Sequence, residues 1–198
     1  MIFEPMIARD IEKKYFYKEV SKEMGFTALK TGLATVNCPY DNEYMNENFL
    51  KELAAKKPTP GGGGVAALLG AISSALGCMV CNFTIGKKKY AKYDEENQRL
   101  LNILNKNMVK FEELIELDAK AFEPLSKAYK LPSENDEEKK KKEEIIEPLL
   151  INSAMVPLKV MRLCGQTLEI ISKLLNQSSV LVLSDVGVAA SCCKSCID

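Results

Sequence analysis

The sequence contains no histidine and no tryptophan. Without histidine, any acid–base chemistry has to use carboxylates, lysine, tyrosine or cysteine, and zinc sites with histidine ligands are excluded. Positive and negative side chains balance at 27 each. Because no global charge attracts polyanions, the composition does not point to nucleic acid or a membrane surface as a partner. We therefore expect no metal, no nucleic-acid partner and no membrane association.

The N-terminus lacks the apolar core of a secretory signal peptide, since Glu4, Arg9, Asp10 and Glu12 are charged. This indicates a cytoplasmic protein. With 198 residues, the chain is long enough for one domain with a substantial core.

Seven cysteines are present, an odd number. Cys78 and Cys81 fall within an apolar run, and Cys192, Cys193 and Cys196 cluster near the end of the sequence. These five could bind a metal together. Their positions in predicted helices instead favour buried free thiols, which are typical of a reducing compartment.

The most informative stretch runs from Thr59 to Tyr90 and reads TPGGGGVAALLGAISSALGCMVCNFTIGKKKY. Thr59 precedes Pro60 and is therefore pushed towards an extended conformation. Gly61–Gly64 can adopt conformations closed to other residues, and Val65–Phe83 predicts a long apolar helix. A glycine turn that opens a helix offers unpaired N–H groups and the positive end of the helix dipole, which suit an anion or a developing negative charge.

Other interpretations of this stretch remain open. It is not a nucleotide P-loop, because Gly64 is followed by Val65-Ala66 in place of a Lys-Ser/Thr pair. The glycines could be a turn without further function. The apolar run could also span a membrane, but several amphipathic segments elsewhere could wrap it, so we expect a buried core helix.

Lys87, Lys88 and Lys89 follow the apolar run. Cations at the end of a helix interact favourably with its dipole, which explains them without a function. The alternative is a docking patch for a polyanionic ligand.

A strongly helical pattern begins at Asp94. Apolar residues recur in steps of three and four, as on one face of a helix: Leu101, Leu104, Met108, Phe111 and Ile115. The same stepping places Asp118 and then Phe122 on this face. A carboxylate in an apolar stripe has to be hydrogen-bonded, paired, shifted in pKa or beside a cavity. A structural ion pair and a catalytic carboxylate are the competing interpretations.

The pattern is interrupted further along. Pro124 should kink or end the helix, Ser133 can cap the next one, and residues 134–144 form a solvated charged start. From Ile146 the apolar stripe returns, with a bend expected at Pro157.

Shorter helices are predicted at the two ends of the sequence. Ile7–Met24 could be amphipathic, and Asn46–Lys57 reads as a short helix. Ser184 is a suitable N-cap and Asp185 complements the dipole of a last helix, Val186–Cys196.

Several motifs together resemble the cyclodeaminase/cyclohydrolase family, which includes formiminotetrahydrofolate cyclodeaminase and methenyltetrahydrofolate cyclohydrolases. They are FLKELAAKKPTPGGGGVAALLGAISSALGCMVCNFTIGKKKY, DAKAFEPLSKAYKLP, Met155-Val156-Pro157-Leu158 and SDVGVAA. The resemblance implies an all-α bundle around a central apolar helix, a homodimer, and a reduced folate as substrate. It covers residues 46–196, so we expect a domain at 46–198 that is short at its C-terminus, with residues 1–45 as an extension of unknown role.

The resemblance also implies roles for individual residues. Asp118 would be the general acid/base or the stabiliser of a cationic one-carbon adduct, with Asp185 as a second candidate. The substrate would contact Thr59, Pro60, Gly61, Gly62, Gly63, Gly64, Asn82, Lys87, Lys88, Lys89 and Ser184, the lysines holding a polyglutamate tail. We expect deamination of 5-formiminotetrahydrofolate with no cofactor beyond the folate itself. The alternatives are methenyltetrahydrofolate cyclohydrolase and an inactive helical scaffold.

Overall fold

The computed structural model describes residues 47–197, and every regular element within them is helical. The elements are α3 (Glu47–Leu53), α4 (Gly62–Asn82), the 3-10 helix η3 (Lys88–Tyr93), α5 (Asp94–Ala128), α6 (Asp136–Gln177), the 3-10 helix η4 (Val180–Val182) and α7 (Leu183–Ile197). The prediction of an all-α bundle is confirmed. The helix expected at Ile7–Met24 and the proposed extension 1–45 lie outside the described residues.

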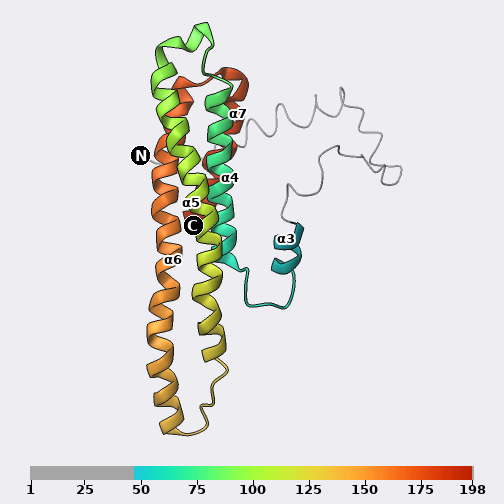
Figure 1. Cartoon of the computed structure of the whole chain (residues 1–198), viewed down its shortest axis with the longest axis vertical. Coiled ribbons are helices and arrows are strands. Elements are labelled where there is room, and N and C mark those ends of the chain that lie inside the picture. The colour runs from blue at the N-terminus through green and yellow to red at the C-terminus, as the bar shows by residue number, and fades with distance from the viewer. Residues whose placement is uncertain (1–46, 198) are drawn as a thin grey trace, which may run out of the picture. The chain divides into compact units, whose positions relative to one another are not determined.

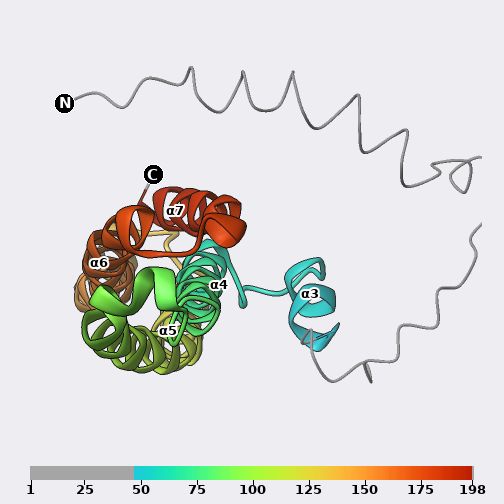
Figure 2. The ribbon, with the colours of Figure 1, turned by 90° about the horizontal axis from the view of Figure 1, so that it is seen from above.

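The apolar helix α4 packs against three others, α5, α6 and α7 (Figure 1). Viewed along the bundle, α4 lies between α5 and α7, with α6 on the other side (Figure 2). The core contains two clusters along α4, one around Leu104 and Ile171 and the other around Phe111 and Val160. The prediction that α4 is the central helix is therefore confirmed.

Three glycines of α4 let α5 approach closely. They recur at seven-residue steps, and a Cβ atom built on each one would collide with an α5 side chain that also recurs at seven-residue steps. Residues seven apart lie on nearly the same face of a helix. The facing pairs, here called the glycine ladder, are Gly63 with Asp118, Gly70 with Phe111, and Gly77 with Leu104.

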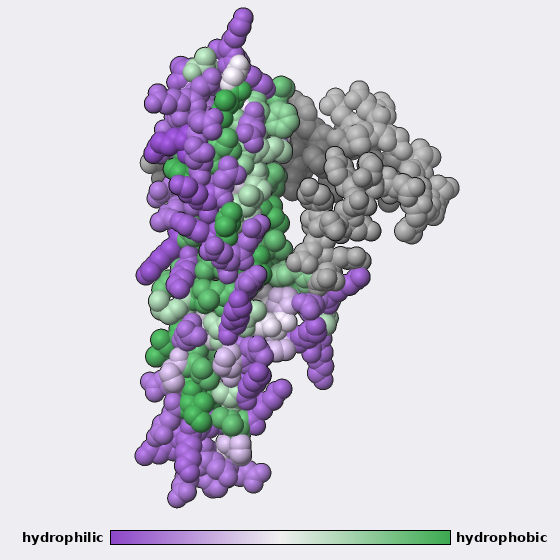
Figure 3. All heavy atoms as spheres, in the orientation of Figure 1, coloured by the Kyte–Doolittle hydropathy of each residue, from purple (hydrophilic) through white to green (hydrophobic). Residues whose placement is uncertain are grey.

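One face of α4 is left without a partner in the described chain. Val65, Leu68 and Met79 are partly exposed along it, and Ile72 is 40% exposed. Figure 3 shows apolar side chains along α4 at the surface of the bundle. A continuous apolar face of this kind is typical of an interaction surface.

Two segments of the described chain are long and apolar enough to cross a membrane, Gly62–Asn82 and Val180–Ile197. This is weak evidence for a membrane span, because the core helix of a soluble protein passes the same test. In α4, 56% of the apolar window is already buried against the other helices.

Two predicted interruptions concern prolines that lie inside helices. Pro124 does not end its helix, since α5 continues to Ala128. Leu125 is 2% exposed and Ala128 5%, so burial of the following turn offsets the lost backbone hydrogen bond. Pro157 lies within α6, which runs from Asp136 to Gln177, and the bend there stays a prediction.

Two cap predictions were wrong. The N-cap of α6 is Asn135, whose side chain accepts a hydrogen bond from the Glu138 N–H at 2.8 Å, while the Glu138 carboxylate accepts from Glu134 N–H. This reciprocal arrangement satisfies two backbone donors and is stronger than a cap by Ser133 alone. Ser184 is not a cap either, because α7 begins one residue earlier, at Leu183.

Candidate active site

Helix α4 begins within the glycine run. Gly61 is its N-cap, with φ −132° and ψ −160°, and the helix starts at Gly62. The described chain has a positive φ only at Gly86, so Gly61–Gly64 do not use the left-handed conformations that glycine permits. The missing Cβ matters at Gly63, because a side chain there would overlap the Asp118 carboxylate.

Asp118 faces the start of α4 from the apolar stripe of α5. Its side chain is half-buried, and its carboxylate accepts a hydrogen bond from the Gly64 backbone N–H. Burial raises the pKa of Asp118, and the Gly64 N–H opposes this only partly. Gly61 provides no side-chain cap, so Asp118 caps α4 from a different helix.

The expected structural ion pair is not formed, because Asp118 has no salt bridge within residues 47–197. Of the alternatives for a carboxylate in an apolar stripe, the structure shows a hydrogen bond, a raised pKa and a neighbouring cavity.

This cavity has a volume of about 400 Å³ and opens beside Asp118. Among the described residues that line it, Asp118 is the charged one, and none is a lysine or an arginine. The remaining wall is largely apolar or backbone: Pro58, Thr59, Gly61, Gly62, Gly63, Phe122, Leu125, Tyr129, Leu150, Ser153, Ala154 and Pro157. Such an apolar hollow with few polar groups is typical of small-molecule sites.

The structure brings one group of the predicted site residues together here. Thr59, Gly61, Gly62, Gly63 and Asp118 all line the cavity. Pro60 and Gly64 adjoin it, and the Cβ of Pro60 would lie 3.7 Å from a Cβ on Gly64.

The other predicted residues lie at the opposite end of α4. Asn82 is its last residue, and at 1.5 Å per residue it is about 28 Å from Gly63. Asp185 belongs to this end too, because α7 runs antiparallel to α4: Ala189 meets Ser73 and Cys196 meets Ala66. Within one chain, the predicted residues therefore do not form a single cleft.

The lysine end of α4 is held by contacts with the segment before α7. The Lys87 ammonium donates to Ser179 Oγ at 3.2 Å, and the Val180 N–H donates to Tyr90 Oη at 3.3 Å. This hydrogen bond lowers the pKa of Tyr90. Lys89 lies 5.5 Å from the ring centre of Tyr90. Lys87 to Lys89 therefore follow α4 in an ordered turn and the start of η3, and Lys87 contacts Ser179, which precedes α7.

The six cysteines within residues 47–197 are free thiols in two separate places. Burial raises the pKa of Cys78 to about 11 and that of Cys81 to about 12. Cys193 lies 3.1 Å from Ser73 Oγ, and Cys196 donates to the Ala66 carbonyl. Among residues 47–197, no group of three cysteine, aspartate or glutamate side chains has a geometry suited to a metal.

Sequence reasoning missed part of the cavity wall. Phe122 comes from α5, Tyr129 directly follows α5, and Leu150 and Ser153 come from α6. The periodicity of α5 placed Phe122 on the same stripe as Asp118, but it did not show that Phe122 lines a cavity. The α6 residues carried no local signal, because their place depends on how α6 pairs with α5.

Comparison with known proteins identifies the family. The model of the formiminotransferase-cyclodeaminase family matches residues 45–198. The chain belongs to this family. Its resemblance to the cyclodeaminase/cyclohydrolase family, inferred from motifs, is thereby confirmed.

Individual members of the family give the same result. A methenyltetrahydrofolate cyclohydrolase from Methylorubrum extorquens is 38% identical over 143 residues, which are 72% of this chain and 69% of the relative. The mouse formimidoyltransferase-cyclodeaminase is 31% identical over 142 residues, but this chain covers only 26% of its length. The crystal structure of formiminotetrahydrofolate cyclodeaminase from Thermotoga maritima superposes with a TM-score of 0.67 at 31% identity, covering 78% of this chain and 73% of that one.

Proposed function

We propose that this chain is an enzyme of folate one-carbon metabolism that converts 5-formiminotetrahydrofolate to 5,10-methenyltetrahydrofolate and releases ammonia. The observation that carries the proposal is the half-buried Asp118 carboxylate, which faces both the first turn of α4 and an apolar cavity. Family membership and the cyclodeaminase of similar structure support the choice of substrate.

The chemistry requires proton transfer beside a developing cation. N10 of the substrate attacks the formimino carbon, the former imine nitrogen is protonated, and ammonia leaves as the methenyl cation forms. Asp118 can transfer a proton between these nitrogens, and its ionised form stabilises the delocalised positive charge. Its raised pKa brings protonated and ionised forms closer in population than in an exposed aspartate.

The apolar wall suits the uncharged part of such a substrate. Phe122 and Tyr129 contribute aromatic rings to the cavity wall, and Leu125, Leu150 and Pro157 add aliphatic surface. Flat rings of a pterin or benzoyl group can stack on such faces. The backbone at Gly61–Gly63 lies open to the ligand because it carries no side chains.

A second candidate function is methenyltetrahydrofolate cyclohydrolase. In this reaction water attacks the methenyl carbon and the ring opens to 10-formyltetrahydrofolate. The specific observation in its favour is the 38% identity to the Methylorubrum cyclohydrolase, above the 31% identity to the mouse cyclodeaminase. Asp118 would then act as the base that accepts a proton from water.

We further propose a homodimer that pairs the unpartnered face of α4 with the same face of a second copy, in antiparallel orientation. With the two-fold axis near Ile72, Gly63 of one copy lies at the same height as Cys81 of the other, because both are equally far from Ile72 along the helix. Lys87–Lys89 of one chain would then lie near the Asp118 cavity of its partner. The cations missing from the cavity wall would be supplied in this way for a polyglutamate tail.

The function is tested by incubating the purified chain with 5-formiminotetrahydrofolate and, separately, with 5,10-methenyltetrahydrofolate while following the absorbance of the methenyl form. Absorbance that appears with the first substrate supports the cyclodeaminase. Loss of absorbance with the second, faster than in buffer, supports the cyclohydrolase. If the absorbance changes with neither substrate and calorimetry detects no folate binding, the chain is an inactive helical scaffold. We place this reaction in the cytoplasm.

The dimer is tested by mixing two variants. Asp118→Asn damages the glycine end, and Lys88→Glu/Lys89→Glu damages the lysine end. In a mixed dimer, one site combines two intact ends, so activity on polyglutamyl substrate should rise above that of either variant alone. No gain after demonstrated subunit exchange would contradict a site shared between chains.

A further inference from the structure

A second hollow, the α5–α6 groove, lies between these two helices and shares no lining residue with the Asp118 cavity. Its volume is about 540 Å³, within the range of roughly 300–1,000 Å³ typical of small-molecule sites. Each helix contributes four lining residues: Lys110, Glu113, Leu114 and Leu117 from α5, and Lys159, Arg162, Leu163 and Gln166 from α6.

The floor of the groove is apolar. Leu114 and Leu163 are almost completely buried at its base, whereas Leu117 remains 39% exposed beside them. A ligand that covers Leu117 would remove apolar surface from water, which favours a partner with an apolar body.

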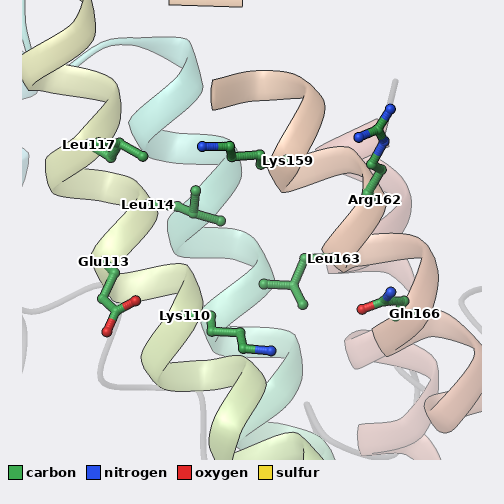
Figure 4. Close-up of a pocket in the computed structure, with 8 residues that line it drawn as sticks. All are labelled: Lys110, Glu113, Leu114, Leu117, Lys159, Arg162, Leu163 and Gln166. Carbon is green, nitrogen blue, oxygen red and sulfur yellow. The ribbon is translucent and has the colours of Figure 1, made fainter. Parts of the chain in front are cut away.

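Cations surround this floor. In Figure 4, the Lys110 side chain extends from α5 towards α6, and Lys159 extends from α6 towards α5. Arg162 adds a third cation at the rim. Their ammonium and guanidinium groups form no salt bridge within residues 47–197, whereas Lys120, further along α5, is paired with Glu116 at 3.2 Å.

One carboxylate lines the groove without balancing these charges. Glu113 forms no salt bridge with them, and Figure 4 shows its carboxylate directed away from the ammonium groups of Lys110 and Lys159. Gln166 lines the groove from α6, and its amide can donate a hydrogen bond. The groove therefore combines an excess of positive charge and a neutral donor with an apolar base.

We propose that the α5–α6 groove binds a small organic carboxylate with an apolar body, in the class of medium-chain fatty acids and aryl carboxylates. The leucine floor takes the apolar body, and Lys110 and Lys159 lie at opposite ends of this floor (Figure 4), so that either ammonium group can bind the carboxylate. This site is separate from the proposed folate reaction, since none of its residues lines the Asp118 cavity.

The first experiment measures binding of octanoate to the full chain by isothermal titration calorimetry. Hexanoate should bind about fifteenfold more weakly than octanoate, because it lacks two methylenes and each buried methylene contributes about fourfold. Octanol has the same chain without the charge and should bind several-fold more weakly. Equal affinity for octanol and octanoate would overturn the role of the lysines.

Variants then assign binding to this groove. Lys110→Gln/Lys159→Gln should weaken octanoate binding by roughly tenfold, since an exposed charge contact contributes up to about fivefold, and leave octanol unchanged. The matched control is Lys106→Gln/Lys194→Gln, which removes two exposed lysines that do not line the groove. An equal loss in the control would show a general charge effect and overturn the proposal.

Two further variants distinguish the floor from other apolar surface. Leu117→Ser should weaken octanoate binding, and Ile72→Ser on the open face of α4 should not; the reverse result would place the site on α4 and contradict the proposal. If the groove instead bound a membrane surface, the chain would bind anionic vesicles, and the Lys110→Gln/Lys159→Gln variant would not; this result would also contradict the proposal. If octanoate dissociated a dimer in sedimentation experiments, the groove would be an interface between two copies of the chain, and the small-molecule assignment would be wrong.

Discussion

The two ends of α4 differ in the chemistry that they present. At the glycine end, backbone N–H groups and the Asp118 carboxylate face an apolar cavity without a lining cation. At the lysine end, Lys87 and Tyr90 are held by polar contacts with the segment before α7. Groups suited to reaction therefore lie at one end of α4, and groups suited to binding an anion lie at the other end, about 28 Å away.

The largest expected effect is at the glycine end. Asp118→Asn should lower kcat by about two to four powers of ten, the usual range for an acid–base group. The measurement is turnover of the folate substrate, with circular dichroism to check that the helices are retained. Unchanged turnover would remove Asp118 from the mechanism and leave it as a helix cap.

The next effect tests the close approach of α4 to α5. Gly63→Ala should lower turnover by up to about a hundredfold, because its Cβ displaces the Asp118 carboxylate and small displacements of reacting groups are costly. Gly165→Ala is the matched control, since a Cβ there meets no atom within 4 Å and Gly165 does not line the cavity. Equal losses in both variants would point to backbone flexibility instead of the Asp118 contact.

A smaller effect is expected at the lysine end. Lys88→Glu/Lys89→Glu should raise KM for polyglutamyl folate by roughly tenfold, as exposed charges contribute up to about 1 kcal/mol each, with a smaller rise for the monoglutamyl form. Steady-state kinetics on both substrates measures the difference. An equal rise for both would argue against a tail site at this end.

The smallest effect concerns stability and pH. Burial raises the pKa of Asp118 above 3.8, so its contribution to the free energy of unfolding is fully present below that pH and is lost as pH rises through the raised pKa. Asparagine does not ionise, so Asp118→Asn should be at least as stable as the parent at pH 7, and this advantage should shrink towards pH 4. Urea unfolding at both pH values measures it; a variant that is less stable only at pH 7 would contradict a raised pKa.

The sequence was sufficient for local features of the site but not for features that depend on helix pairing. Asp118 could be identified because steps of three and four along α5 placed it among buried residues. The sequence could not show that Gly63, and not Gly62, contacts Asp118, since this contact depends on the register between α4 and α5. The single cleft that we expected does not form within one chain. The rise of α4 separates Gly63 from Asn82, although their motifs are close in the sequence.

The glycine ladder also limits how this chain can change in length. Its pairs recur at seven-residue steps on both helices, so inserting one residue between Phe111 and Asp118 would turn the carboxylate by roughly 100° away from α4. Inserting seven residues would restore its direction but move it beyond the start of α4. Insertions and deletions compatible with the site are therefore confined to the tip of the α5–α6 hairpin and other segments that lie beyond the ladder.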